Sequence, residues 1–116
     1  MGRLTTHVLD TAQGCPAASV SVELYRIDPE RQLLKKDQTN SDGRLDSPIL
    51  DSDAFQTGVY ELVFQAGSYF RASSLELPDP AFVDEVVLRF GIADADAHYH
   101  VPLLVSPWSY STYRGS

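Results

Sequence analysis

Two of the three histidines lie two residues apart near the C-terminus, at His98 and His100. Residues 98–105 alternate apolar residues with others, as a β-strand with one buried face does. The expected core face carries Tyr99, Val101, Leu103 and Val105. The two imidazoles would then stand on the opposite face, about 7 Å apart at their Cα atoms. Because a neutral imidazole can accept or return a proton near neutral pH, this pair is a candidate acid–base site.

His7, the third histidine, and Arg44 widen the chemistry that this pair can do. An H-x-H strand is also a common zinc-binding pair, and His7 can supply a third ligand. The spacing leaves metal binding and water activation equally open. Arg44 follows the turn dipeptide Asp42-Gly43, and its guanidinium offers a planar fork of donors to a carbonyl group or an oxyanion.

Other familiar catalytic patterns are missing from the sequence. It contains no G-x-S-x-G, no Walker loop, no H-E-x-x-H and no C-x-x-C. We expect Cys15, the single cysteine, to be a small, partly buried thiol beside a turn and not a nucleophile. The acidic residues are scattered over turns and polar faces, so we expect them to be solvated. The candidates that remain are the histidines, Arg44 and the C-terminal end.

The C-terminal end is unusual, because chain ends that fray are generally small and polar. It carries Trp108, Tyr110 and Tyr113, and it finishes Arg114-Gly115-Ser116. We expect a tail so rich in aromatic residues to dock into a sheet or an interface.

Short strands separated by turns must position these residues. Alternating apolar residues predict strands at 4–10, 19–27, 58–66, 83–92 and in the tail, and a polar edge strand at 32–39. A further short strand is expected at 69–73, and a helical turn or two within 74–80. The pattern predicts an all-β sandwich of seven to eight antiparallel strands with one short helix.

The composition limits the classes of partner. A chain of 116 residues predicts a single domain, 1–116, that can bury a core without disulfides. Its net charge of −7 argues against a nucleic-acid partner, because phosphate binding needs a basic surface. No apolar run is long enough to cross a membrane. With no signal peptide and one cysteine, we expect a soluble, cytoplasmic protein.

Three segments, in the right order and spacing, resemble one known family. They are the tail H-Y-H-V-P-L-L-V-S-P-W-S-Y-S-T-Y-R-G-S, the start L-T-T-H-V-L-D with G-C-P-A, and T-N-S-D-G-R at 39–44. They are similar to segments of the 5-hydroxyisourate hydrolases, transthyretin-like enzymes of urate breakdown, and the Y-R-G-S ending is the most specific part. The resemblance covers essentially the whole chain and implies a transthyretin-like β-sandwich.

The resemblance also implies an activity and a set of residues. The activity is hydrolysis of 5-hydroxyisourate to 2-oxo-4-hydroxy-4-carboxy-5-ureidoimidazoline, without a cofactor or metal. The catalytic set carried over from the family is His7, Arg44, His100 and Ser116. The substrate-binding set is His98, Tyr113, Arg114 and Gly115. We expect His7 and His100 to activate water and Arg44 to hold the developing negative charge.

The family resemblance further implies a homotetramer, a dimer of dimers with its sites at the dimer–dimer interface. Two other functions remain open. One is a carrier of a small hydrophobic ligand, in the manner of transthyretin, and the other is an adhesion-type sandwich in which the histidines are incidental. Histidines, an arginine and a polar tail suit a polar purine derivative better than an apolar hormone.

Overall fold

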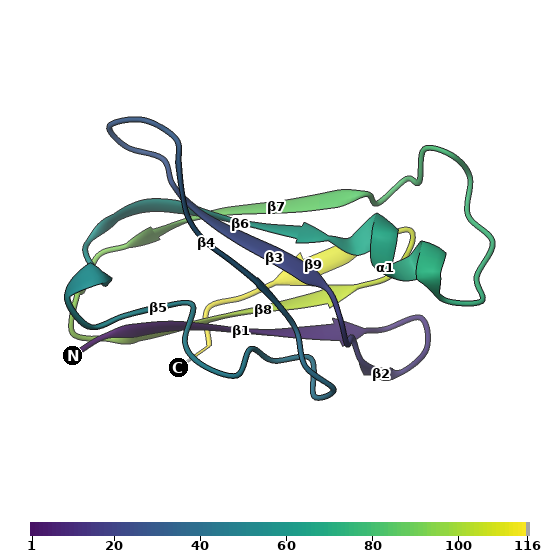
Figure 1. Cartoon of the computed structure of the whole chain (residues 1–116), viewed down its shortest axis with the longest axis horizontal. Helices are drawn as coiled ribbons and strands as arrows, with labels where there is room; N and C mark the ends of the chain where they lie inside the picture. Colours follow the sequence, from purple (N-terminus) through teal and green to yellow (C-terminus); the bar gives the residue numbers. More distant parts are fainter. Residues whose placement is uncertain (116) are drawn as a thin grey trace.

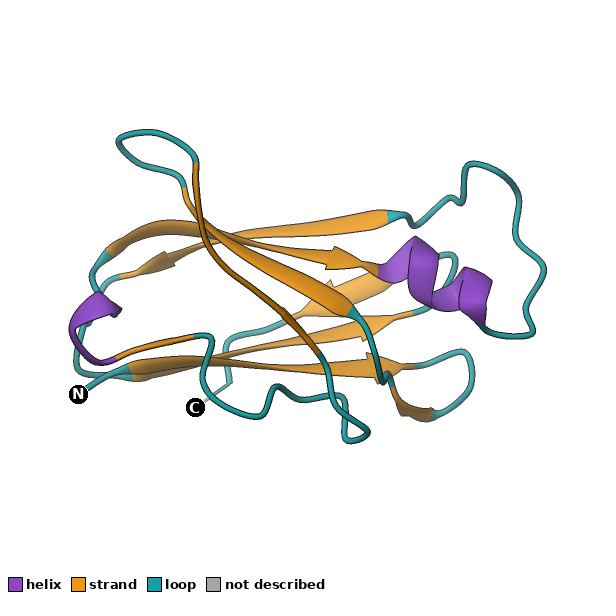
Figure 2. Ribbon diagram, in the orientation of Figure 1, coloured by secondary structure: helices purple, strands orange, loops and turns teal. Residues whose placement is uncertain are grey.

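In a computed structural model of the chain, which describes residues 1–115, two β-sheets pack face to face (Figure 1). The strands are β1 (Arg3–Asp10), β2 (Cys15–Pro16), β3 (Ser21–Arg26), β4 (Gln32–Gln38), β5 (Leu50–Asp51), β6 (Gly58–Gln65), β7 (Glu85–Ile92), β8 (His98–Val105) and β9 (Tyr110–Thr112). The helices are a 3-10 turn, η1 (Ser52–Ala54), and α1 (Ala66–Ala72), which lies at one end of the sandwich (Figure 2). The all-β sandwich expected from the sequence is confirmed, and seven of the described strands have three or more residues.

The first sheet has the strand order β2-β1-β8-β9, with β5 also paired to β1. The second has the order β4-β3-β6-β7, and all of its pairs are antiparallel. One pair departs from the expected antiparallel arrangement: β1 and β8 run parallel over their full length. Since a parallel pair needs a long connection, the whole second sheet and α1 lie between these two strands in the chain.

The core lies between the sheets and follows the period-two pattern. On β1 the side chains of Leu4, Thr6 and Val8 are buried, and the Thr6 hydroxyl donates a hydrogen bond to the Val101 carbonyl. On β8 the residues expected to face inward are buried as well: Tyr99, Val101, Leu103 and Val105. This alternation leaves the other residues of β1 and β8 on the outer face of the first sheet.

The helix lies elsewhere than expected. Aromatic Tyr69 and Phe70 favoured a short strand at 69–73 followed by helical turns within 74–80, whereas α1 spans Ala66–Ala72. Phe70 is fully buried, and the Gly67 amide donates a hydrogen bond to the carbonyl of Asp84, just before β7. A Cβ atom on Gly67 would come within 2.2 Å of an oxygen of Asp84. Gly67 is therefore a point of close packing and not the strand breaker that the sequence suggested.

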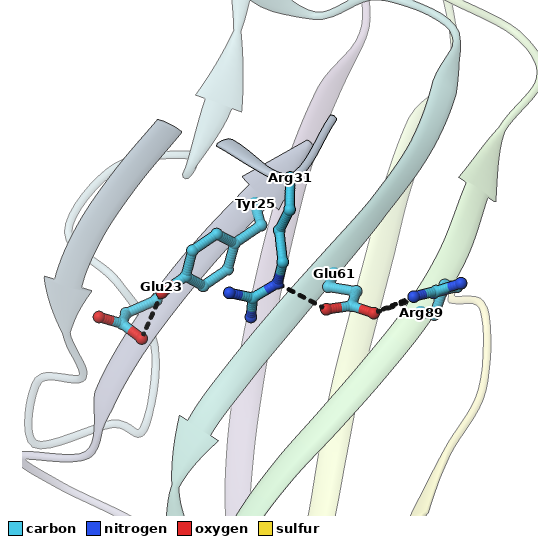
Figure 3. A network of polar contacts seen from close by, with 5 residues as sticks. All are labelled: Glu23, Tyr25, Arg31, Glu61 and Arg89. Carbon is cyan, nitrogen blue, oxygen red and sulfur yellow. Dashed lines mark hydrogen bonds and ion pairs between the residues drawn. The ribbon is translucent and has the colours of Figure 1, made fainter. Parts of the chain in front are cut away.

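The acidic residues are not all solvated, contrary to expectation. On the outer face of the second sheet, the Glu61 side chain is only 8% exposed and pairs with Arg31 and Arg89 (Figure 3). Arg31 also covers the Tyr25 ring, with its guanidinium carbon 3.7 Å from the ring centroid. Two arginines thus compensate one buried carboxylate, which pattern reading had placed in water.

No described helix is long and apolar enough to cross a membrane.

Candidate functional site

His98 and His100 stand side by side on the outer face of the first sheet, as the alternation predicted. Both side chains are half-buried, and the centroids of their rings are 6.2 Å apart. Strand β8 holds them in place because its other face is anchored in the core.

Thr5 joins the two rings, and sequence reasoning missed it. The parallel register places Thr5 of β1 directly beside His100 of β8. Its hydroxyl oxygen lies 2.7 Å from His98 Nε2 and 2.8 Å from His100 Nδ1. The burial of Leu4, Thr6 and Val8 puts Thr5, which alternates with them, on the outer face. The alternation does not predict that β1 pairs with β8.

His7 and Arg44 are partners in an isolated antiparallel β-bridge, and both reach the outer face of the first sheet. The chain from Gly43 to Asp51 runs along the free edge of β1, where the Val8 amide donates a hydrogen bond to the Gly43 carbonyl at 2.8 Å. Gly43 has φ +76°, and a Cβ atom there would lie 2.4 Å from the Val8 carbonyl oxygen. Only glycine fits this turn, which delivers Arg44 to the site.

The tautomer of a neutral His7 follows from its partner. His7 Nε2 lies 2.8 Å from the carbonyl oxygen of Asp42. A backbone carbonyl can only accept, so Nε2 carries the proton and donates it. In the neutral ring, Nδ1 is therefore the nitrogen with a free lone pair.

The histidine pair and Arg44 line an open cavity of about 590 Å³, and His7 is not among its lining residues. Its wall includes Thr5, His98, His100 and Arg44, and residues 45–48 also line it. Arg3 also lines it, a second cation that sequence reasoning did not identify. The volume lies within the range of about 300–1,000 Å³ usual for small-molecule sites. A cavity with two imidazoles and two guanidinium groups suits a polar, electron-rich ligand.

Both imidazoles of the pair are biased toward the neutral form. Burial lowers the pKa of His100 below its ordinary value of 6.5, and the charge of Arg44 lowers this pKa further. Burial likewise lowers the pKa of His98, with Arg3 and Arg114 adding to the effect. A neutral ring keeps a lone pair, so each can accept a proton near pH 7.

The tail docks along β8, as expected, and brings Gly115 against His100. After β9 the chain continues beside β8, and the Gly115 amide donates a hydrogen bond to the His100 carbonyl at 2.7 Å. A Cβ atom on Gly115 would lie 2.9 Å from Cδ2 of the His100 ring. Any larger residue would therefore push the ring from its position.

The other tail residues expected at the site do not line the histidine cavity where the structure describes them. The Arg114 guanidinium covers the Tyr99 ring, with its carbon 4.1 Å from the centroid. Tyr113 and Arg114 line a second cavity of about 390 Å³, beside β7, and neither is among the residues lining the histidine cavity. Ser116, predicted to take part in catalysis, lies outside the described residues.

Neither sulfur nor metal chemistry gains support from the geometry. Cys15 is exposed, not partly buried as expected, because β2 is a two-residue strand at the edge of the sheet. Within residues 1–115, no three His, Cys, Asp or Glu side chains lie close enough together to hold a metal ion. The three-histidine zinc arrangement that the spacing left open is not formed in this structure.

Comparison with known proteins gives a consistent result. The model of the HIUase/Transthyretin family matches residues 4–115. A 5-hydroxyisourate hydrolase of Pseudomonas aeruginosa is 62% identical over all of this chain and 93% of its own length. The crystal structure of (S)-allantoin synthase superposes with a TM-score of 0.95 at 49% identity, covering 99% of this chain and 44% of that one. A Klebsiella pneumoniae 5-hydroxyisourate hydrolase superposes over the full length of both chains, with a TM-score of 0.82 and 33% identity.

Proposed function

This chain belongs to the HIUase/Transthyretin family, and we propose that it is a 5-hydroxyisourate hydrolase. Its reaction converts 5-hydroxyisourate to 2-oxo-4-hydroxy-4-carboxy-5-ureidoimidazoline, a step of urate degradation. The identity of 62% to a full-length relative of that name supports this activity. The observation that carries the proposal is the cavity that joins two neutral imidazoles to the Arg44 guanidinium.

The site residues have distinct roles in this proposal. Hydrolysis adds one water molecule: a bond forms from the water oxygen to a ring carbonyl carbon, the ring carbon–nitrogen bond breaks, and a proton reaches the released nitrogen. His100 accepts the proton of the attacking water, because burial and Arg44 keep its ring neutral. Arg44 donates hydrogen bonds to the oxygen on which negative charge develops. His7, with Nε2 held by Asp42, offers Nδ1 to orient the water.

The tail completes the site in the same proposal. Gly115 fixes the backbone of His100, and Arg114 keeps a positive charge near His98. We assign Tyr113 to substrate binding through the assembled protein, and Ser116 to the catalytic set, as the family resemblance implies. No cofactor or metal enters this reaction, and we place the protein in the cytoplasm.

We further propose a homotetramer, a dimer of dimers with its sites at the interface between the dimers. Strand β7 ends the second sheet and carries an exposed Val87, while Tyr113 lies exposed on the neighbouring tail. Unpaired edges with apolar side chains are typical of surfaces that a second copy covers. Native mass spectrometry at micromolar concentration should give four times the mass of the 12.8 kDa chain. A monomer under those conditions would exclude this assembly.

A small-ligand carrier is the second candidate function. The fold favours it, since the family that matches the chain also includes transthyretin. Against it, the histidine cavity presents charged and hydrogen-bonding groups, whereas an apolar ligand gains most from an apolar lining.

The wild-type protein should accelerate the decay of 5-hydroxyisourate produced in situ by urate oxidase, followed by its near-ultraviolet absorbance. Chelators should leave the rate unchanged. The rate should fall as the pH is lowered through the pKa of His100, because a protonated ring cannot accept the proton of water. The half-maximal rate is expected below pH 6.5, since the pKa of His100 is lowered. Decay at the spontaneous rate would exclude the hydrolase and leave the carrier.

A further inference from the structure

The hydroxyl group of Thr5 is held between two imidazole nitrogens, and no catalytic role has been given to it so far. Its oxygen is 2.7 Å from His98 Nε2 and 2.8 Å from His100 Nδ1. Both distances are those of good hydrogen bonds. Thr5 is fixed in this position by the register of β1 and β8 and by the burial of its neighbours Leu4 and Thr6.

The number of available hydrogens limits how the two rings can bond to Thr5. A hydroxyl group has one hydrogen to donate and lone pairs with which to accept. It can donate to only one of the two imidazole nitrogens, so when both hydrogen bonds are made at least one ring donates to it. Neutral imidazoles carry one proton each, so the ring that donates to Thr5 and the ring that accepts from it have fixed tautomers.

Two arrangements of the neutral pair use the hydroxyl hydrogen between the rings; in a third, both rings donate to the oxygen and the hydrogen turns toward the cavity. In the first, His100 carries its proton on Nδ1 and donates it to Thr5, which donates to Nε2 of His98. His100 Nε2 then has a free lone pair, as a general base requires. In the second, every hydrogen bond is reversed, and His100 Nε2 carries a proton that it can give away.

We propose that the Thr5 hydroxyl group is a positioning group that couples the tautomers of His98 and His100, so that one ring nitrogen of His100 alternates between base and acid. The inference rests on the proposed hydrolase function for its kinetic consequences, but the tautomer coupling itself does not. Thr5 orients and relays, while His100 meets the reacting atoms.

The coupling gives a balanced path for the proton. His100 Nε2 accepts a proton from the attacking water, the Nδ1 proton of His100 passes to the Thr5 oxygen, and the Thr5 proton passes to Nε2 of His98. The added positive charge then lies on His98, and His100 is neutral with a proton on Nε2. Returning the three protons in reverse order delivers one proton to the leaving nitrogen and restores the starting state. The added charge thus leaves the ring beside Arg44 for the ring beside Arg3 and Arg114, whose charges also disfavour it, so the charged state is transient.

The first test is kinetic, with Thr5→Val removing the hydroxyl group at nearly constant shape. We expect kcat to fall about 10- to 100-fold, the loss typical when the hydrogen-bond partner that orients a metal-bound histidine is removed, with little change in KM. Thr5→Ser should restore most of the rate. Thr11→Val is the matched control. The Thr11 hydroxyl donates a hydrogen bond to the Val105 carbonyl on β8 and makes none to a histidine ring. A Thr5→Val rate equal to that of Thr11→Val would overturn the proposal.

The second test needs no substrate. The chain has only three histidines, so the ring nitrogen chemical shifts can be read from a two-dimensional ¹⁵N spectrum of the wild type. Above the pKa values of the rings, His98 and His100 should show opposite protonation at the nitrogens facing Thr5, and Thr5→Val should abolish this correlation. Two rings protonated in the same way toward Thr5 would overturn the proposal, even if Thr5→Val fails to fold. Opposite protonation in a wild type that does not hydrolyse 5-hydroxyisourate would support the coupling and exclude the proposed function.

Discussion

Replacing His100 by glutamine should lower kcat for 5-hydroxyisourate hydrolysis by about 10²- to 10⁴-fold, the usual contribution of a positioned acid–base group. Glutamine keeps a polar side chain in the cavity but cannot exchange a proton with water. Because the ring is also one wall of the cavity, KM should rise, but by less than kcat falls. Stopped-flow measurement of substrate decay at saturating concentration separates the two constants.

The pH profile distinguishes a lost base from a disturbed cavity. Wild-type activity should decline below pH 6.5 as His100 is protonated, whereas the residual activity of His100→Gln should lack this acidic limb. The fold should survive the substitution, since the side chain points away from the core and the neighbouring Tyr99 and Val101 remain buried. A His100→Gln variant within threefold of the wild-type rate would remove His100 from the mechanism.

The alternation of β1 and β8 was enough to predict which side chains face outward. It placed His98 and His100 together because residues two apart on a strand share a face, whichever strand is beside them. The position of Arg44 followed from the Asp42-Gly43 turn only in part. The turn itself could be predicted from the Asp-Gly dipeptide. Its hydrogen bond to Val8 on β1 could not, because the two segments are far apart in the chain.

The sequence pattern does not show which distant strands pair with each other. A period-two pattern gives no direction, so the parallel alignment of β1 with β8, and with it the place of Thr5 between two rings, could not be predicted. The same limit applies to Gly115. A Cβ atom at this position would be too close to a neighbour only because the tail packs against the His100 ring. Glu61 was assigned to solvent because its two arginine partners come from other segments, 28–31 and β7.

Replacing Arg44 by methionine should reduce kcat by about 10²- to 10³-fold, the usual cost of removing one donor that stabilises an oxyanion. Methionine keeps much of the length of the side chain and removes its charge and its donors. The substitution should also raise the pKa of His100, because the positive charge of Arg44 currently disfavours the protonated ring. The acidic limb of the pH profile should therefore move to higher pH than in the wild type, measured both from kcat and from the ring nitrogen shifts.

A control with the same change of net charge separates these local effects from a general one. Arg89 lies on the outer face of the other sheet, where it pairs with Glu61 (Figure 3). Arg89→Met should leave the pH profile of hydrolysis where it is, because solvent and salt screen a charge on the far side of the sandwich. If Arg44→Met and Arg89→Met moved the acidic limb equally, the lowered pKa of His100 would come from the overall charge of the protein. A shift confined to Arg44→Met, together with the loss of rate, requires Arg44 to act within the cavity on both the base and the developing oxyanion.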